Sequence, residues 1–279
     1  MLAGISSILL GLMFFLVIGI GLSIYLAVIW QIGARRSAAI SDPSIAPPAK
    51  NFELPEALLA GILVFLLSAS ILASIGRSPI PLNTPDLIHS FLIQNFLIAV
   101  AVVFFIAAFL KLRGLNINLL GGFSKTSLKR AVSTGIILLA AATPLILLAE
   151  AITQGLFGGG SSRQEIVDLF NSSQTLQQRV MIIVLAVVVA PMSEEFIFRF
   201  FIYGVVRRYF GIAIGLIFNS FLFAAAHNHV PSILPLFVLA GSFTLAYEWS
   251  GSILVSMAMH ALFNSVQLIL LAFPDLFQQ

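Results

Sequence analysis

Long apolar runs alternate with short polar segments along most of the chain. A helix that crosses a bilayer needs about 20 mostly apolar residues. Segments that meet this requirement are residues 5–30, 56–76, 88–112, 131–156, 180–206, 211–228, 231–248 and 252–273. The pattern therefore predicts an all-α, polytopic bundle of about eight transmembrane helices.

The composition supports a membrane protein. Of the 279 residues, 59% are hydrophobic and 9% are charged, and the mean hydropathy is +1.08. Soluble domains are roughly 45–50% apolar and about 25% charged. Too few polar residues remain to cover a surface that faces water, so the bilayer is the expected solvent. The net charge of +3 is too small to indicate a nucleic-acid partner. The absence of cysteine excludes disulfides, thiolate nucleophiles and cysteine-based metal sites.

Basic residues gather in alternate loops between the predicted spans. Arg35 and Arg36 follow the first span, and Arg207 and Arg208 follow the fifth. The loop after the third span holds the largest basic group, Lys111, Arg113, Lys125, Lys129 and Arg130. The positive-inside rule places such loops in the cytoplasm. We therefore expect both termini to be exoplasmic, in what we take to be a bacterial plasma membrane.

The fifth predicted span contains two carboxylates and a guanidinium, Glu194, Glu195 and Arg199. Glu194 lies 15 residues after Arg179 and 13 before Arg207, which corresponds to roughly 22 Å and 20 Å of helix. These groups are therefore expected near the middle of the bilayer. There, each charge costs at least about 2.5–3.5 kcal/mol on insertion scales. Such a cost suggests that the charges serve a function.

The two glutamates are expected to differ in their surroundings. Glu195 and Arg199 are four residues apart, so they share a helix face and can form an ion pair. Such a pair could simply lock helices together. Glu194 points about 100° away around the helix and lacks this local partner, so we expect it to face a wet cavity. Pro191 is expected to loosen the helical turn just before both.

Two further spans carry polar pairs with the same spacing of four residues. These are Phe223 with His227, and His260 with Asn264. Taken alone, a histidine at position 227 is most often a packed or interfacial residue, and the pair at 260 and 264 is explained about equally well as an interhelical hydrogen-bonding pair or as part of a site. Together with Glu194 they place a hydrolytic set of groups on three helices. A carboxylate can take a proton from water, an imidazole can orient the water, and His with Asn can donate to an oxyanion.

These three motifs resemble the CPBP family of CAAX protease and bacteriocin-processing intramembrane endopeptidases, which includes the type II CAAX prenyl endopeptidases. The family pattern is EExxxR, FxxxH and HxxxN on separate helices. It occurs here as Glu194-Glu195-x-x-x-Arg199, Phe223-x-x-x-His227 and His260-x-x-x-Asn264. The resemblance covers about residues 180–270.

The resemblance implies a glutamate-dependent peptide hydrolysis. Glu194 and His227 would activate the water, and His260 and Asn264 would stabilise the tetrahedral oxyanion. The second glutamate and the arginine of EExxxR would hold the site or position the substrate, with Phe223 in support. The substrate would be a membrane-associated or lipidated peptide, and the reaction needs no metal.

Three alternatives remain open. Glutamate and histidine also bind zinc, so a zinc-dependent variant is possible, although the HExxH ligand motif is absent. A non-enzymatic protein with a bacteriocin-immunity or partner-binding role could retain the same motifs. A transporter could use intramembrane Glu and His as a proton relay, but the first four predicted spans carry almost no charge.

The motifs are confined to one part of the chain. Residues 1–130 contain none of them and are expected to form about three helices of unassigned role. Residues 131–279 are expected to form the protease-like helical core, with the site in its last four helices.

Overall fold

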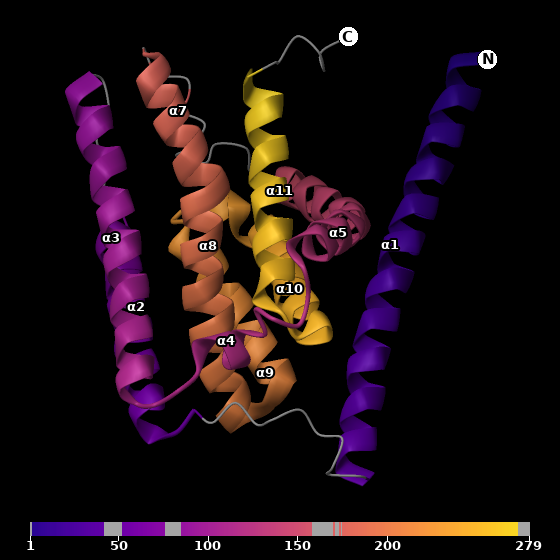
Figure 1. The fold of residues 1–279 in the computed structure, drawn as a ribbon. Coiled ribbons are helices and arrows are strands. Elements are labelled where there is room, and N and C mark those ends of the chain that lie inside the picture. Colours follow the sequence, from indigo (N-terminus) through magenta and orange to yellow (C-terminus); the bar gives the residue numbers. More distant parts are fainter. Residues whose placement is uncertain are drawn as a thin grey trace.

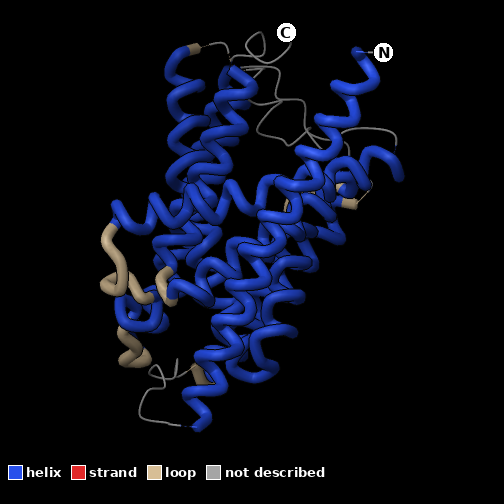
Figure 2. The backbone as a smooth tube through the Cα atoms, turned by 90° about the vertical axis from the view of Figure 1, so that its right-hand side faces the viewer, coloured by secondary structure: helices blue, strands red, loops and turns tan. Residues whose placement is uncertain are grey.

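The structure, a computed structural model, describes residues 2–41, 52–75, 85–157, 170, 173 and 175–272. All regular elements of these residues are helical, and none is a strand (Figure 2). The predicted all-α bundle is therefore confirmed.

The helices follow the predicted spans closely. They are α1 (Leu2–Ser41), α2 (Leu54–Ser74), α3 (Pro85–Leu112), the short α4 (Ile117–Gly121), α5 (Leu128–Phe157), α7 (Leu176–Val184), α8 (Ala190–Glu194), α9 (Tyr203–Ala226), α10 (Ile233–Ser250) and α11 (Ile253–Ala272). Two π-helical segments, η2 (Leu185–Val189) and η3 (Glu195–Ile202), join α7, α8 and the first part of α9, up to Gly211, into one rod. A short 3-10 turn, η4 (Val230–Ser232), precedes α10.

The structure and the sequence differ in how they divide the fifth and sixth spans. The described residues contain seven helices that are long and apolar enough to cross a membrane, and one of these runs over Leu176–Ala226. Within it, Gly211 has φ 84° and ψ 176°, a backbone conformation that glycine tolerates and other residues rarely adopt. This break separates the two predicted spans, 180–206 and 211–228.

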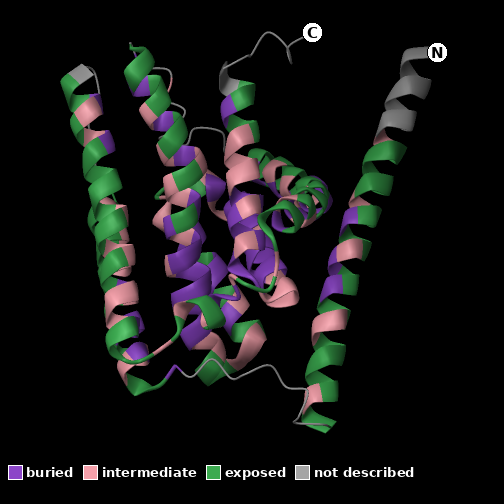
Figure 3. Cartoon of the chain, in the orientation of Figure 1, coloured by how far each residue is buried: buried purple, intermediate pink, exposed green. Residues whose placement is uncertain are grey.

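The most buried helix is α10. In its most apolar part 61% of the residues are buried, against 11% for α2 and for α3. Helices α1 and α5 pack on the side of α10 and α11, while α2 and α3 pack against the rod formed by α7 to α9. Figure 3 shows buried residues concentrated on the central helices and exposed residues on α1 and α3. The other helices therefore enclose α10, and the centre of the bundle is the place where α10 packs against α9 and α11.

The outer surface is apolar. Phe15 and Phe65 are each 70% exposed, and Phe104 is 72% exposed. They belong to α1, α2 and α3, the helices on the outside of the bundle in Figure 1. Large exposed apolar areas of this kind mark contact with a membrane or a partner. In Figure 1 the start of α1 and the end of α11 lie at the same end of the bundle.

Candidate active site

The two adjacent glutamates lie where the rod departs from α-helical hydrogen bonding. The N–H of Ala190 bonds to the carbonyl of Leu185, and the N–H of Tyr203 bonds to that of Phe198. Both bonds span five residues, as in a π-helix, and they lie on either side of the glutamates. π-Helical turns of this kind occur frequently at functional sites.

Pro191 accounts for a hydrogen bond between α11 and this rod. Proline has no N–H, so in the π-helical register the carbonyl of Ala186 has no backbone donor five residues ahead. The Nδ2 of Asn264 donates to this carbonyl at 2.7 Å. The proline expected to loosen the turn therefore exposes an acceptor, and a side chain from α11 occupies it.

The ion pair expected from the spacing of Glu195 and Arg199 is present. The Nη1 of Arg199 lies 2.9 Å from the Oε1 of Glu195, and both side chains are fully buried. The Nη2 of Arg199 donates to the carbonyl of Ala240 at 3.4 Å. Its Cζ lies 4.2 Å from the ring centroid of Phe223, within the range of a cation–π contact. The guanidinium thus joins η3 to α9 and α10.

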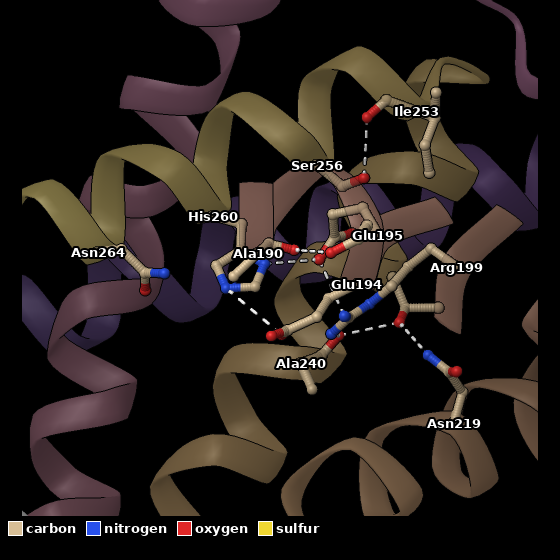
Figure 4. Close-up of polar contacts among 12 residues, drawn as sticks. Ala190, Glu194, Glu195, Arg199, Asn219, Ala240, Ile253, Ser256, His260 and Asn264 are labelled. Atoms are coloured by element: carbon tan, nitrogen blue, oxygen red, sulfur yellow. Dashed lines mark hydrogen bonds and ion pairs between the residues drawn. The ribbon is translucent and has the colours of Figure 1, made fainter. Parts of the chain in front are cut away.

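His260 lies between the two glutamates (Figure 4). Its Nδ1 is 3.0 Å from the Oε1 of Glu195, and its Nε2 is 3.9 Å from the Oε2 of Glu194. An ionised carboxylate only accepts hydrogen bonds, so Nδ1 carries a proton and donates it to Glu195. The ring also stacks on Phe243, with centroids 4.9 Å apart and 27° between the planes. These contacts orient Nε2 toward Glu194.

The groups of this cluster differ in charge and in exposure. With His260 neutral, two carboxylates and one guanidinium leave a single negative charge. The Glu194 side chain is 30% exposed, whereas those of Glu195 and Arg199 are 0% and that of His260 is 5% exposed. Of these four groups, Glu194 is therefore the most exposed, although its Oε2 is buried and has no hydrogen-bond partner in the described part of the chain.

Phe223 connects this cluster to His227. Its buried ring lies 5.9 Å from the ring centroid of His260 and 4.7 Å from that of His227. The Nδ1 of His227 donates to the carbonyl of Phe223 at 2.8 Å, which leaves Nε2 as the acceptor nitrogen. Within the described part of the chain, no hydrogen bond or ion pair joins His227 to Glu194 or to His260.

The structure therefore brings some of the predicted site residues together and holds others apart. Glu194, Glu195, Arg199 and His260 form one contact cluster, and the ring of Phe223 lies against it. The ring of Phe223 separates His227, at the end of α9, from this cluster. Asn264 is on the same helix as His260 but is hydrogen-bonded to η2.

Helix α10 contributes groups that reasoning from the sequence missed. The carbonyl of Ala240 accepts from Arg199 and also from the Oγ1 of Thr244 at 2.9 Å. Thr244 in turn accepts from the Nδ2 of Asn219 at 3.3 Å. A detectable signal was the run Ala240-Gly241-Ser242 in the middle of an apolar span. Small residues let membrane helices approach closely, as the stacking of Phe243 on His260 requires.

All the motif residues lie in one stretch of chain that a known family matches. Residues 176–266 match the family model for type II CAAX prenyl endopeptidases, Rce1-like. The chain carries an Rce1-like endopeptidase domain. This match supports a peptidase of the CAAX intramembrane type. No curated protein and no solved structure matches the chain.

The Rce1-like match and the apolar helices together make the chain a multi-pass integral membrane protein. Its peptidase-like stretch begins with α7 and includes the whole contact cluster. Among the residues that the structure describes, no group of three or more His, Asp or Glu side chains is arranged to hold a metal ion.

We predict that the Glu195–Arg199 pair behaves as a single unit in stability. Arg199→Met should destabilise the fold by roughly 3–5 kcal/mol, because it leaves the Glu195 carboxylate buried without its counter-ion. The double variant Glu195→Gln/Arg199→Met removes both charges and should recover at least half of that loss. Denaturant titration in detergent, followed by intrinsic fluorescence, measures the free energy of unfolding. A double variant as unstable as Arg199→Met would contradict the prediction.

Proposed function

We propose that this protein is an intramembrane endopeptidase that hydrolyses a peptide bond at or within the bilayer by means of water activated by Glu194. The observation that chiefly supports this is the pairing of a partly exposed carboxylate with a buried imidazole. The Oε2 of Glu194 faces the Nε2 of His260 at 3.9 Å. The Rce1-like match over the same residues supports the same reaction class.

In the proposed reaction, Glu194 accepts a proton from a water molecule whose oxygen attacks the carbonyl carbon of the scissile bond. A C–O bond forms, and the carbonyl oxygen becomes an oxyanion. Protonated His260 donates a hydrogen bond to this oxyanion through Nε2. As the C–N bond breaks, the proton on Glu194 passes to the leaving nitrogen. The products are a carboxylic acid and an amine, and both catalytic groups return to their starting states.

Glu195 and Arg199 act as positioning residues in this proposal. The Glu195 carboxylate holds the Nδ1–H of His260 at 3.0 Å, which keeps Nε2 directed at Glu194. The Arg199 guanidinium keeps that carboxylate ionised and therefore able to accept. A carboxylate that orients a histidine in this way has the role of the aspartate in a Ser-His-Asp triad.

His227 and Asn264 complete the proposed catalytic set. His227 donates through Nδ1 to Phe223, so its Nε2 is available to accept a hydrogen bond from the water that Glu194 activates. The amide of Asn264 has two N–H groups. One of them bonds to Ala186, and the other remains to donate to the oxyanion beside His260.

We further propose that the substrate is a peptide whose end is membrane-associated or lipidated, and that it is cleaved without a metal. Residues 131–279 would supply the catalytic core. Residues 1–130 would enclose it, because α1 contacts α5 and α10, while α2 and α3 contact the rod that carries the glutamates.

We predict that purified protein in liposomes cleaves members of a library of farnesylated and unmodified C-terminal peptides, and that Glu194→Gln abolishes this cleavage. Glutamine keeps the shape of the side chain but cannot accept a proton from water. The matched control is Glu150→Gln, which removes a carboxylate from α5 instead. Mass spectrometry identifies the cut bond, and a chelator is added in a parallel assay.

The outcomes of this assay separate the alternatives. Cleavage that resists the chelator and requires Glu194 fits the proposal. Loss of cleavage on chelation, with recovery on adding zinc, would replace it with a zinc-dependent peptidase. A third outcome is that the folded wild type cleaves no peptide and the Glu194→Gln variant keeps its cellular role. This outcome would favour an immunity or partner-binding function.

We predict that Asn264→Ala lowers kcat about 10²-fold or more with little change in KM, because an oxyanion donor acts mainly in the transition state. The control is Ser265→Ala, since the hydroxyl of Ser265 bonds only within its own helix in the structure. Single-turnover kinetics on a cleaved library peptide measures the effect. If Asn264→Ala lowers the melting temperature but leaves kcat intact, the side chain serves only to bind Ala186.

We predict that both termini are exoplasmic. The start of α1 and the end of α11 lie at one end of the bundle (Figure 1), and the loops rich in Arg and Lys belong to the opposite end. Reporter fusions that are active only on one side of the membrane, attached to each terminus, test this. Cytoplasmic reporter activity at both ends would reverse the orientation, and opposite results would mean an odd number of crossings.

A further inference from the structure

A second polar site lies at the end of the bundle opposite the start of α1 and the end of α11. It is a pocket of about 400 Å³ formed by the last part of α1, the α4 segment, the first part of α9 and the end of α10. In Figure 1 these segments lie in the lower part of the bundle. The pocket shares no residue with the glutamate cluster, and Arg207 in its wall is 13 residues beyond Glu194, roughly 20 Å along a helix.

The pocket is strongly basic. Its charged lining residues are Arg35, Arg36, Lys125, Arg207, Arg208 and Glu248. The one carboxylate is already engaged, because Glu248 pairs with Arg207 at 2.8 Å and accepts from the hydroxyl of Tyr203 at 2.8 Å. Four formal positive charges therefore remain uncompensated around one cavity. An anion is the ligand that such a cavity favours.

The pocket is held in shape by the end of α10. Gly122, with φ 65°, packs so closely on the turn at Gly251 that a side chain at position 122 would collide with the carbonyl oxygen of Gly251. The Nη1 of Arg35 donates to the carbonyl of Trp249 at 2.7 Å, and the ammonium of Lys125 lies against Gly251. The negative end of the α10 dipole thus anchors two of the cations.

Arg36 and Arg208 differ from these anchored cations. Both are exposed, and one comes from α1 and the other from α9. In the part of the chain that the structure describes, neither makes a hydrogen bond or ion pair through its side chain. The guanidinium fork matches the oxygens of a phosphate group, which it can bind with two parallel hydrogen bonds. These two arginines are therefore placed to bind a ligand from two walls.

The surroundings indicate the source of that phosphate. Leu119 in the pocket wall is exposed, and Tyr209 and Phe210, directly after Arg208, are exposed as well. Apolar side chains beside a basic pocket at the end of a membrane bundle suit a ligand with acyl chains. Basic pockets between transmembrane helices bind anionic lipid head groups. We propose that this basic pocket binds the phosphate head group of an anionic phospholipid.

The test compares two variants that each remove two positive charges. Arg36→Gln/Arg208→Gln changes the pocket, and Lys129→Gln/Arg130→Gln changes two exposed cations on α5 that do not line it. The probes are dioctanoyl phosphatidylglycerol, dioctanoyl phosphatidylcholine and inorganic phosphate. Binding to the full chain in neutral detergent is measured by native mass spectrometry and by calorimetry, and circular dichroism and thermal melting check the fold.

We expect saturable binding of phosphatidylglycerol and not of phosphatidylcholine. The pocket variant should bind roughly 30-fold more weakly, since each surface cation contributes roughly fivefold to binding an anionic lipid. The α5 variant should bind as the wild type does. Arg36→Lys/Arg208→Lys keeps the charge but loses the bidentate fork, so its affinity should fall between that of the wild type and that of the glutamine variant. If the double glutamine variant does not fold, the two single substitutions, Arg36→Gln and Arg208→Gln, are compared with the wild type in its place.

Three results would overturn the proposal. An equal loss in the α5 variant would mean diffuse attraction to the basic end of the bundle. Equal binding of phosphatidylcholine would mean that the acyl chains alone are recognised. Inorganic phosphate that displaces the lipid at comparable concentration would assign the pocket to a soluble phosphate compound.

Discussion

The buried ion pair between Glu195 and Arg199 is the interaction on which the rest of the site depends. Two charges in an apolar interior are costly unless they are paired and further hydrogen-bonded. The guanidinium of Arg199 is also held by the carbonyl of Ala240 and the ring of Phe223, and the carboxylate of Glu195 is also held by His260. In the described part of the chain, only the Nε of Arg199 and the Oε2 of Glu195 in this pair are buried without a hydrogen-bond partner. Each of these partners belongs to a different helix. Satisfying one ion pair therefore fixes how α9, α10 and α11 lie around η3.

This ion pair also gives the two adjacent carboxylates different surroundings. Glu195 is fully buried and bound to both Arg199 and His260, so it can orient but cannot meet a substrate. Glu194 is turned away and stays partly exposed, so it can exchange a proton with water. Their different roles follow from helix geometry, because neighbouring residues point in directions about 100° apart.

Much of this could be predicted from the sequence because it depends on local spacing. The apolar runs predicted the helices, and the separation of four residues predicted the contact of Glu195 with Arg199. Contacts between helices could not be predicted in the same way. Periodicity assigns Asn264 to a face of α11, but it does not reveal that Pro191 leaves a carbonyl on η2 for that side chain. Nor does it reveal which apolar helix lies at the centre, so Phe243 and the carbonyl of Ala240 went unnoticed.

The glutamate cluster and the basic pocket are joined by the same two helical segments. From Arg199 to Arg207 the rod contacts α10 through side chains at both ends, at Ala240 near the cluster and at Glu248 beside the pocket. Tyr203, between them, reinforces the second contact through its hydroxyl. A ligand that altered the Arg207–Glu248 pair would therefore act on a segment already fixed to the guanidinium that supports the site. Coupling of this kind requires two arrangements of the segment with different affinities for the ligand. The close packing around buried Tyr203 restricts those arrangements, so head-group binding would hold the rod in place rather than move it.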